Sequence, residues 1–383
     1  MPLPQHRLAI VRTLASPIDR RFYNSQELGL GRALLQHQVS TDVYVASTKS
    51  EVTETLIAEQ GDASLKLLEC PCRSLPLISQ AWMPKVAQRL VSTDYDLIHV
   101  NESNEIESWR IAKLARRSNV PLLLYQGMHK PIEGRLQSCF QAVFDRLMLP
   151  SLRHNTTIAC GKTQRAAQYL EERGFAAPRV MPVGLDPTPL ETDTAVDWRE
   201  KLSIAKHTKM VLYVGVLEER RNPDLILELA ARNPEFMFVI AGTGPAEQKT
   251  REECDRRQLK NLQLLGQVPQ NTLPDLYRNS DLSLLPSDYE IYGMTVLESM
   301  YFGTPVMASR TAGPESIIDH DRNGWLIDSM SVDDWNQTLL QVTGSPTTLT
   351  DVAKAAEKKI HEKLTWKAIA EDYSALLETA GRS

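Results

Sequence analysis

Short, continuously apolar runs separated by longer amphipathic segments limit the fold of this sequence more than any other feature. The runs are rich in Val, Ile and Leu, and they occupy residues 8–11, 43–46, 97–100, 122–125, 210–214, 237–241, 282–285 and 305–308. Continuous rather than alternating apolarity is typical of strands that are buried on both faces of a sheet. The sequence therefore predicts an α/β protein with parallel sheets.

The segments between these runs have the length and pattern of crossover helices, which join neighbouring parallel strands. They cover residues 24–37, 80–91, 105–117, 162–173, 224–232 and 245–258. The alternation breaks between residue 182 and about residue 208, where Pro, Thr and Asp are dense. We interpret this stretch as a linker between an N-terminal domain over residues 1–185 and a C-terminal domain over residues 205–363, both of ordinary domain size.

Charge and cysteine content exclude several classes of protein. Lys and Arg number 43 and Asp and Glu number 48, and the resulting net charge of −5 disfavours a dedicated nucleic-acid binder. The five cysteines are scattered and lack the spacing of a zinc site or a disulfide framework. Because no signal peptide or membrane-spanning run is visible, we expect a cytoplasmic protein, with peripheral contact at the inner face of a membrane left open.

The segment that follows the predicted strand at 282–285 carries two carboxylates beside a predicted helix start. Glu290 lies in the loop, and a helix that begins near Tyr292 or Gly293 carries Glu298 and ends at Gly303. A helix N-terminus presents unpaired N–H groups and a partial positive charge, which suit the phosphates of a nucleotide. Glu298 could accept two hydrogen bonds from a vicinal diol such as a ribose, and Glu290 could accept one from a sugar hydroxyl.

This segment resembles the donor-site signature of retaining GT-B glycosyltransferases of family 4. The pattern is Pro-Ser-x-x-Glu-x-Tyr-Gly-x-x-x-x-Glu over residues 286–298, followed by Gly-Thr-Pro-Val at 303–306. Segments 211–217, 240–245, 262–266, 276–281 and 321–327 match the family in the same order. The resemblance implies two Rossmann-like doubly wound domains that face a central cleft, with the acceptor bound by the first domain and the nucleotide sugar by the second. It also implies that a C-terminal helix at about 364–383 packs back on the first domain.

The resemblance assigns roles to individual residues of the second domain. Glu298 would hold the nucleotide ribose and Glu290 the hydroxyls of the donor sugar, while backbone N–H groups from Tyr292 to Thr295 would cradle the distal phosphate. The complete expected donor site is Gly215, Arg220, Arg221, Gly242, Gln267, Val268, Glu290, Tyr292, Gly293, Met294, Thr295 and Glu298.

The sequence departs from the family pattern at the cations that contact the diphosphate. Val216 stands where the family has an Arg, and Arg221 stands where it has a Lys. One cation in place of two would weaken stabilisation of the leaving group unless Arg220 substitutes. His129 is the candidate for the family's histidine near the reacting sugar, although it lies two residues past the expected register. We therefore assign Glu290, Arg221 and His129 as the candidate catalytic residues.

The first domain gives weaker indications of an acceptor site. The loop at 12–26 contains Arg21 and Tyr23, and loop arginines with aromatic neighbours could receive an anionic acceptor. The ends of predicted strands supply the other candidates, namely Asn101, Glu102, Gln126 and Lys162. Of these, Asn101, Glu102 and Lys162 could equally serve as helix caps. The helical stretches at 109–117 and 140–153 could lie on an anionic membrane, but core packing with a solvated edge explains their composition as well.

The sequence therefore predicts a hexosyl-type glycosyltransferase that takes a nucleoside diphosphate sugar as donor and retains the anomeric configuration. The acceptor would be a glycan, a lipid-linked glycan or a small metabolite, as in polysaccharide biosynthesis. No metal or other cofactor is expected, because no Asp-x-Asp clamp occurs where this fold would need one. Two alternatives stay open, a nucleotide-sugar epimerase of the same fold and a catalytically inactive sugar-nucleotide-binding protein.

Overall fold

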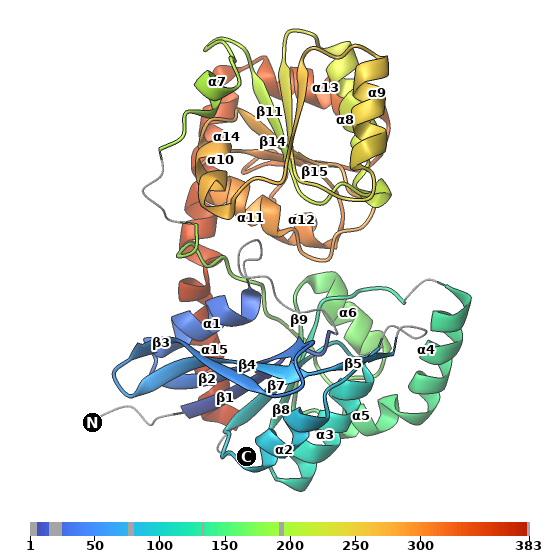
Figure 1. Cartoon of the computed structure of the whole chain (residues 1–383), viewed down its shortest axis with the longest axis vertical. Helices are drawn as coiled ribbons and strands as arrows, with labels where there is room; N and C mark the ends of the chain where they lie inside the picture. Colours follow the sequence, from blue (N-terminus) through green and yellow to red (C-terminus); the bar gives the residue numbers. More distant parts are fainter. Residues whose placement is uncertain (1–5, 15–24, 76–79, 132–133, 191–194, 381–383) are drawn as a thin grey trace. The chain divides into compact units, whose positions relative to one another are not determined.

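A computed structural model of the chain describes residues 6–14, 25–75, 80–131, 134–190 and 195–380. The chain forms two compact units (Figure 1). The N-terminal unit comprises Met1–Asp186 together with Trp366–Ser383, and the C-terminal unit comprises Pro187–Thr365.

The N-terminal unit is built on an eight-stranded sheet with strand order β10-β9-β8-β7-β1-β2-β4-β3. Its strands are β1 (His6–Val11), β2 (Val39–Ser47), β3 (Thr53–Gln60), β4 (Ala63–Pro71), β7 (Leu97–Asn101), β8 (Leu122–Gln126), β9 (Ile158–Gly161) and β10 (Arg179–Val180). A separate hairpin pairs β5 (Arg73–Leu75) with β6 (Gln80–Trp82).

Two features of this unit differ from the sequence prediction. The sheet is not wholly parallel, because β3 pairs with β4 in the antiparallel sense. The two are joined through Gly61, whose φ of 60° suits a short hairpin connection, and such a connection can only join antiparallel strands. The helix expected from residue 80 begins at Pro84 instead, because residues 80–82 form β6.

Helices cover both faces of the N-terminal sheet (Figure 1). They are α1 (Gln26–Leu35), α2 (Pro84–Val91), α3 (Ile106–Arg117), α4 (Arg135–Leu147), α5 (Leu149–Asn155), α6 (Gln164–Glu172) and α15 (Trp366–Ala380). Helices α1 and α15 pack against each other, and a Cβ added at Gly29 would lie 2.5 Å from the indole of Trp366. The other face buries Ala9 and Val11 of β1 with apolar residues of α2, α3 and α5. The last helix of the chain therefore completes the core of the first unit.

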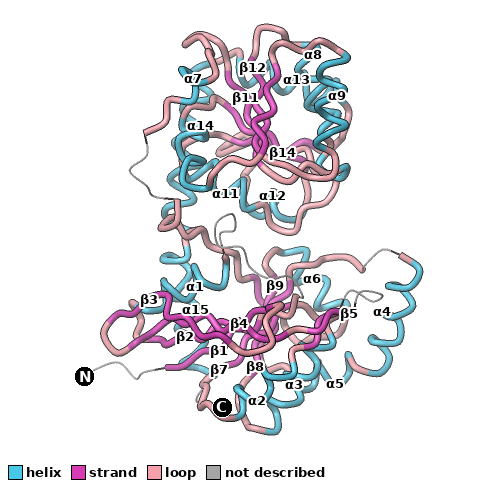
Figure 2. The backbone as a smooth tube through the Cα atoms, viewed as in Figure 1, coloured by secondary structure: helices cyan, strands magenta, loops and turns pink. Residues whose placement is uncertain are grey.

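The C-terminal unit contains a six-stranded sheet with strand order β13-β12-β11-β14-β15-β16, and its paired strands are parallel. Figure 2 shows its strands between two layers of helices. The strands are β11 (Met210–Val214), β12 (Met237–Ala241), β13 (Leu262–Gly266), β14 (Leu282–Leu285), β15 (Val306–Ser309) and β16 (Trp325–Ile327). The helices are α7 (Trp198–Lys201), α8 (Pro223–Arg232), α9 (Glu247–Arg256), α10 (Leu273–Arg278), α11 (Met294–Tyr301), α12 (Ala312–Ile317), α13 (Val332–Thr343) and α14 (Pro346–Lys363).

The segment interpreted as a linker contributes to the second unit, which starts at Pro187 rather than at residue 205. Trp198 is buried, and its backbone N–H donates to the side-chain oxygen of Asn279 at 2.6 Å. Arg199 forms an ion pair with Asp281. Segment 195–204 is thus anchored to the C-terminal unit by burial and by polar contacts.

The sheet order places a switch point in the C-terminal unit between β11 and β14. The chain leaves β11 toward β12 and β13 on one side, and it returns to β14, β15 and β16 on the other side. In open α/β sheets, ligands bind beyond the carboxyl ends of the strands at such a point. The loops that follow β11 and β14 are therefore the first place to look for a site.

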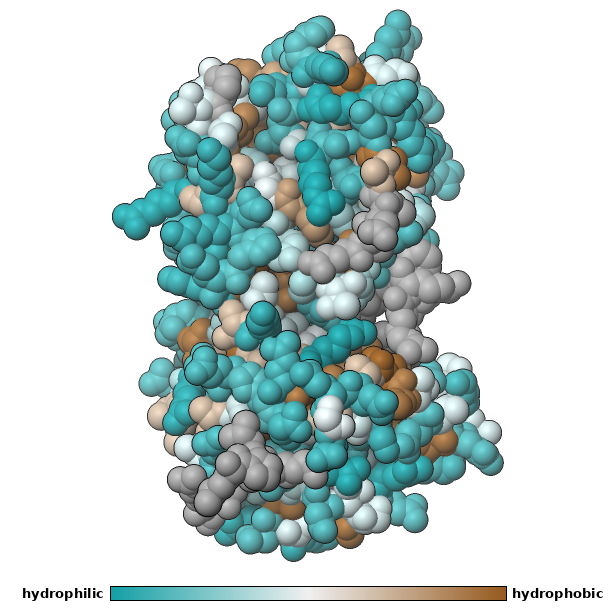
Figure 3. All heavy atoms as spheres, turned by 90° about the vertical axis from the view of Figure 1, so that its left-hand side faces the viewer, coloured by the Kyte–Doolittle hydropathy of each residue, from teal (hydrophilic) through white to brown (hydrophobic). Residues whose placement is uncertain are grey.

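Within the described residues, no helix is long and apolar enough to cross a membrane. The face of the chain drawn in Figure 3 is mainly hydrophilic, with small and separate hydrophobic areas.

Candidate functional site

The loops after β11 and β14 bring Arg221 and Glu290 together. Strands β11 and β14 pair in parallel, so both loops leave the same edge of the sheet. Arg221 ends the short 3-10 turn η2 (Glu219–Arg221), and its Nη1 forms an ion pair with Oε2 of Glu290. The same Nη1 donates to the hydroxyl of Ser287 at 3.3 Å. Two residues that the sequence resemblance assigned to one reaction therefore lie in direct contact.

The two loops are also joined through Arg220, which in addition forms an ion pair with Glu218 of its own loop. Arg220 Nη1 donates to the carbonyl oxygen of Tyr289 at 2.7 Å, and its Nη2 lies 2.6 Å from Oε1 of Glu218. The N–H of Asp288 donates to the carbonyl oxygen of Arg220 at 2.9 Å. Arg220 is thus placed beside Arg221. Val216 lies earlier in the same loop with its side chain half exposed, and its carbonyl oxygen accepts from the hydroxyl of Tyr213 at 2.8 Å.

Helix α11 begins directly after the loop that carries Glu290. Its N-cap is Gly293, with a φ of 92°, and no side chain within the described residues caps it. A left-handed φ favours glycine, which explains why this residue starts the helix. The first N–H groups of an α-helix have no partner within the helix, so those of Met294 and Thr295 are available to an anion.

Glu298 lies one turn into α11 and is buried. Its Oε2 accepts a hydrogen bond of 3.0 Å from the hydroxyl of Tyr277, at the end of α10. Burial raises the pKa of Glu298 to about 7, and the hydrogen bond from Tyr277 partly opposes that effect. Glu298 therefore titrates near neutral pH, and its ionised form is the stronger hydrogen-bond acceptor.

Gly215 and Gly242 form a close backbone contact at the carboxyl ends of β11 and β12. A Cβ added at Gly242 would lie 1.9 Å from the carbonyl oxygen of Gly215, so a larger residue cannot fit without a shift of the backbone. The N–H of Gly242 donates to the carbonyl oxygen of Gly266, immediately before Gln267 and Val268. The expected base-reading loop is therefore linked by backbone hydrogen bonds to the loop that carries the arginines.

In the N-terminal unit, Glu102 and Gln126 are brought together at the carboxyl ends of β7 and β8. The Glu102 carboxylate accepts hydrogen bonds from Nε2 of Gln126 at 2.7 Å, and from the N–H groups of Gly127 and Met128 at 3.0 and 3.2 Å. Glu102 has a left-handed φ of 61°, and burial raises its pKa. Gln126 is fully buried and also accepts from the N–H of Ser103. In this conformation the pair braces two loops.

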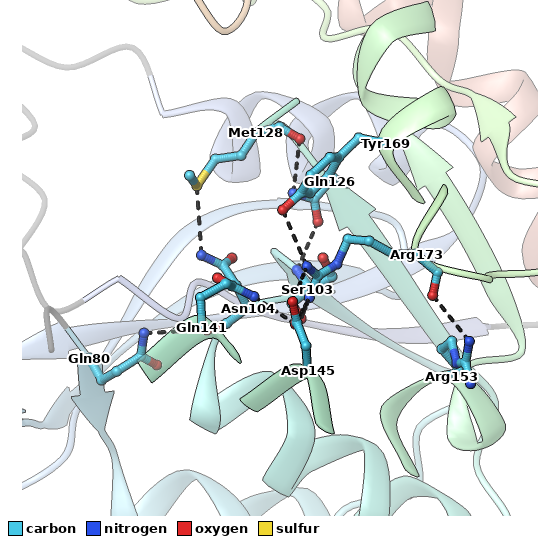
Figure 4. Close-up of polar contacts among 10 residues, drawn as sticks. All are labelled: Gln80, Ser103, Asn104, Gln126, Met128, Gln141, Asp145, Arg153, Tyr169 and Arg173. Atoms are coloured by element: carbon cyan, nitrogen blue, oxygen red, sulfur yellow. Dashed lines mark hydrogen bonds and ion pairs between the residues drawn. The ribbon is translucent and has the colours of Figure 1, made fainter. Parts of the chain in front are cut away.

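Figure 4 shows the polar cluster around Gln126. Arg173 pairs with both carboxylate oxygens of Asp145, at 3.1 and 2.6 Å, and its Nη2 also donates to the carbonyl oxygen of Ser103 at 3.5 Å. Gln141 of α4 donates to the same Asp145 at 2.7 Å. The cluster therefore connects α4 and the end of α6 to the loop that follows β7.

Two further acceptor candidates lie beside the contact between Glu102 and Gln126. Asn101 directly precedes Glu102, and the backbone N–H of Lys162 donates to the carbonyl oxygen of Gln126 at 2.8 Å. Asn101 donates to Glu27 of α1 at 3.5 Å, and the Nζ of Lys162 donates to Gln26 at 3.1 Å. His129 is half buried, and this burial lowers its pKa to about 4, so the ring is neutral at physiological pH. Arg21 and Tyr23 lie outside the described residues.

No group of three or more His, Cys, Asp or Glu side chains in the described part of the chain is placed to hold a metal ion. The expected independence from metal ions stays a prediction.

Two residues near the donor-site candidates were absent from the sequence prediction. Glu218 contacts Arg220 and lies three residues before Arg221, a spacing that could have pointed to it. Tyr277 is far from Glu298 in the sequence, and only the packing of α10 beside α11 brings its hydroxyl to that carboxylate.

Comparison with known proteins gives this geometry its context. Residues 195–359 match the family model described as glycosyl transferases group 1. The D-inositol 3-phosphate glycosyltransferase of Corynebacterium jeikeium is 29% identical over 418 residues, which cover 97% of this chain and 96% of that protein. An uncharacterized glycosyltransferase of Methanocaldococcus jannaschii is 28% identical over 208 residues, which cover 51% of this chain and 53% of that protein. The chain thus matches about half the length of the second relative.

The fold has a counterpart among solved structures. HepE of Anabaena, in complex with UDP and glucose, superposes with a TM-score of 0.71 at 15% identity, covering 98% of this chain and 100% of that chain. These comparisons define the class of protein as a glycosyltransferase with the GT-B fold. Within the chain, residues 195–359 are thus similar to the glycosyl transferases group 1 family.

Proposed function

We propose that this chain transfers a sugar from a nucleoside diphosphate sugar to an acceptor, with retention of the anomeric configuration and without a metal ion. The observation that carries the proposal is the contact between Arg221 and Glu290 at the switch point between β11 and β14, directly before the N-terminus of α11. The relatives named as glycosyltransferases and the neighbour solved with UDP and glucose support this choice of substrate.

The proposed donor site divides the nucleotide sugar among three elements. Glu298 accepts hydrogen bonds from the ribose hydroxyls, and the N–H groups of Met294 and Thr295 bind the distal phosphate. Glu290 accepts a hydrogen bond from a hydroxyl of the transferred sugar. Arg221 stabilises the negative charge that develops on the leaving diphosphate, with Arg220 beside it.

The proposed reaction needs no enzymatic nucleophile. The bond between the anomeric carbon and the phosphate oxygen breaks, and the acceptor oxygen forms a bond to the same face of that carbon. The acceptor proton passes to an oxygen of the leaving phosphate. Arginine and the start of α11 supply the positive field that a metal ion provides in other enzymes, so a chelator should leave turnover unchanged.

A donor screen followed by product analysis tests this proposal. Thermal shift across UDP, GDP, ADP and their common sugars identifies the donor, because a ligand of the folded state raises stability by mass action. NMR of the product then reports the anomeric configuration of the new bond. A changed sugar in the absence of acceptor would indicate the epimerase instead, and binding without turnover or hydrolysis would indicate a non-catalytic protein.

We also propose that α4 contacts an anionic membrane surface. Leu136, Val143 and Leu147 are 63%, 54% and 67% exposed, and their spacing places them on one side of the helix. Exposed Arg135 and Arg146 lie on the same helix and can meet anionic headgroups. This apolar and basic stripe would bring a lipid-linked acceptor to the enzyme.

Flotation with vesicles that contain anionic lipid tests the membrane proposal. The variant Leu136→Ser with Leu147→Ser should lose most vesicle binding, whereas Leu56→Ser, at an exposed position of the edge strand β3, should bind normally. Absence of wild-type binding at low salt would refute the proposal.

A further inference from the structure

Glu218 holds both arginines of the candidate donor site. It lies between β11 and the turn η2, and its Oε1 is 2.6 Å from Nη2 of Arg220 and 3.8 Å from Nε of Arg221. Its side chain is 30% exposed, compared with 11% for Glu290. Glu218 is therefore the more accessible of the two carboxylates that neutralise these arginines.

The charges of this cluster balance when no ligand is bound. Arg220 and Arg221 contribute two positive charges, and Glu218 and Glu290 contribute two negative charges within ion-pair distance. All four also act electrostatically on the buried hydroxyl of Tyr213, beneath the loop. A diphosphate that approaches this neutral cluster gains the full attraction of the arginines only if a carboxylate gives up its contact.

One hydrogen-bond donor of the cluster has no acceptor. Nε of Arg221 is buried and has no hydrogen-bond partner among the described residues, and 3.8 Å to Glu218 is too long for a hydrogen bond. A phosphate oxygen in place of the Glu218 carboxylate could accept from this group. The arrangement therefore holds the arginines in position but leaves them incompletely satisfied.

We propose that Glu218 competes with the diphosphate for Arg220 and Arg221, and so limits the affinity of the enzyme for its nucleotide. This inference rests on the proposed function, in which these arginines bind a nucleoside diphosphate. When the nucleotide binds, Glu218 turns toward solvent, and when the product leaves, Glu218 returns to the arginines. Glu218 acts through the two arginines and is a positioning residue.

The substitution Glu218→Gln tests the proposal. It removes the competing charge and keeps the size of the side chain, so the nucleoside diphosphate should bind about fivefold more tightly at low salt, which corresponds to about 1 kcal/mol, the upper range for an exposed ion pair. The matched control is Glu219→Gln, because Glu219 is exposed and adjacent but forms no ion pair with either arginine. The affinity of Glu219→Gln for the nucleoside diphosphate should stay within about twofold of the wild-type affinity, as expected for a screened surface charge.

The probes are UDP, GDP and ADP with the matching nucleosides uridine, guanosine and adenosine, measured by titration calorimetry on the full chain. The gain should appear for the diphosphate and not for the nucleoside, because only the diphosphate contacts the arginines. A general structural change would alter both, and melting curves of each variant show whether the fold is kept.

The outcomes separate this inference from the proposed function. If Glu218→Gln binds the diphosphate more tightly than the wild type but binds the nucleoside with the same affinity, the role of Glu218 is supported. If folded Glu218→Gln binds the diphosphate no more tightly than the wild type, the role of Glu218 is overturned. The proposed function still stands in that case, provided that the wild type binds the diphosphate. If wild type binds none of the three diphosphates, the proposed function fails and the inference fails with it.

Discussion

The pKa of Glu298 predicts that nucleotide affinity rises with pH around neutrality. Burial raises this pKa to about 7 in the free protein, whereas a ribose diol donates its hydrogen bonds to the ionised form. For a pKa near 7, the ionised fraction is about 10% at pH 6 and about 90% at pH 8. Nucleoside diphosphate affinity should therefore increase by about tenfold over this interval.

The substitution Tyr277→Phe should move this pH dependence to higher pH. The hydroxyl of Tyr277 donates to Glu298 and stabilises its charge, and a hydrogen bond to a charged group contributes about 1.5 kcal/mol, or about one pKa unit. The variant should bind nucleotide about fivefold more weakly near pH 7 and about as well as wild type near pH 9.

Titration calorimetry between pH 6 and pH 9 measures both effects. A 2′,3′-dideoxynucleoside diphosphate is the control, because it keeps the phosphates, which also titrate in this range, but lacks the hydroxyls that Glu298 would bind. The reasoning is refuted if the dideoxy and normal nucleotides show the same pH dependence, or if Tyr277→Phe leaves the profile in place.

Three further predictions concern the same unit. Glu290→Gln and Arg221→Ala should each lower turnover at least about a hundredfold, as loss of a transition-state contact typically does, while circular dichroism shows that the fold is kept. Near-normal activity in both would refute their roles. Glu298→Gln should stabilise the free protein at pH 8 by about 3 kcal/mol and by little at pH 4, because a folded pKa of about 7 against 4.5 costs stability as the pH rises between these values. Chemical denaturation at both pH values measures this, and an equal effect at both would contradict it. Gly242→Ala should destabilise the fold by at least about 2 kcal/mol, because its Cβ would collide with the Gly215 carbonyl oxygen; an unchanged melting temperature would count against this close contact.

The strands that the sequence predicts best are those buried on both faces. The continuous runs at 210–214 and 237–241 coincide with β11 and β12. Successive side chains of these strands face opposite helix layers, so nearly every position is buried and apolar. Strand β3 escaped prediction because it is an edge strand with the polar sequence Thr-Glu-Thr-Leu-Ile-Ala-Glu-Gln, and it gains its structure from pairing with β4. The local pattern of apolar residues indicates which strands are buried, whereas the formation of an edge strand depends on its partner strand.

In the candidate donor site, too, some residues are predictable from the local sequence and others depend on contacts between distant segments. Glu290, Gly293 and Glu298 follow one another in the sequence, so their grouping around α11 can be predicted locally. The contact of Glu290 with Arg221 follows only from the pairing of β11 with β14, and the resemblance to a known family assigned the two residues to one site without predicting that they touch. Tyr277 has no local signal, because its role depends on how α10 packs against α11.

The N-terminal unit shows why acceptor residues are harder to predict. The rule that ligands lie at strand ends selected Asn101, Glu102 and Gln126 correctly as strand-end residues, but it does not distinguish a side chain that faces a ligand from one that braces a loop. The hydrogen bonds of Glu102 and Gln126 are made within the protein. That distinction depends on side-chain contacts between elements distant in the sequence.

Hydrogen–deuterium exchange with and without saturating nucleoside diphosphate is the most direct test of a donor site at the switch point of the C-terminal unit. The account predicts slower exchange in residues 215–222 and 287–298, which contain the arginines, Glu290 and the start of α11. Protection that falls only in other parts of the chain, or a bound nucleotide that leaves both segments unchanged, would contradict it.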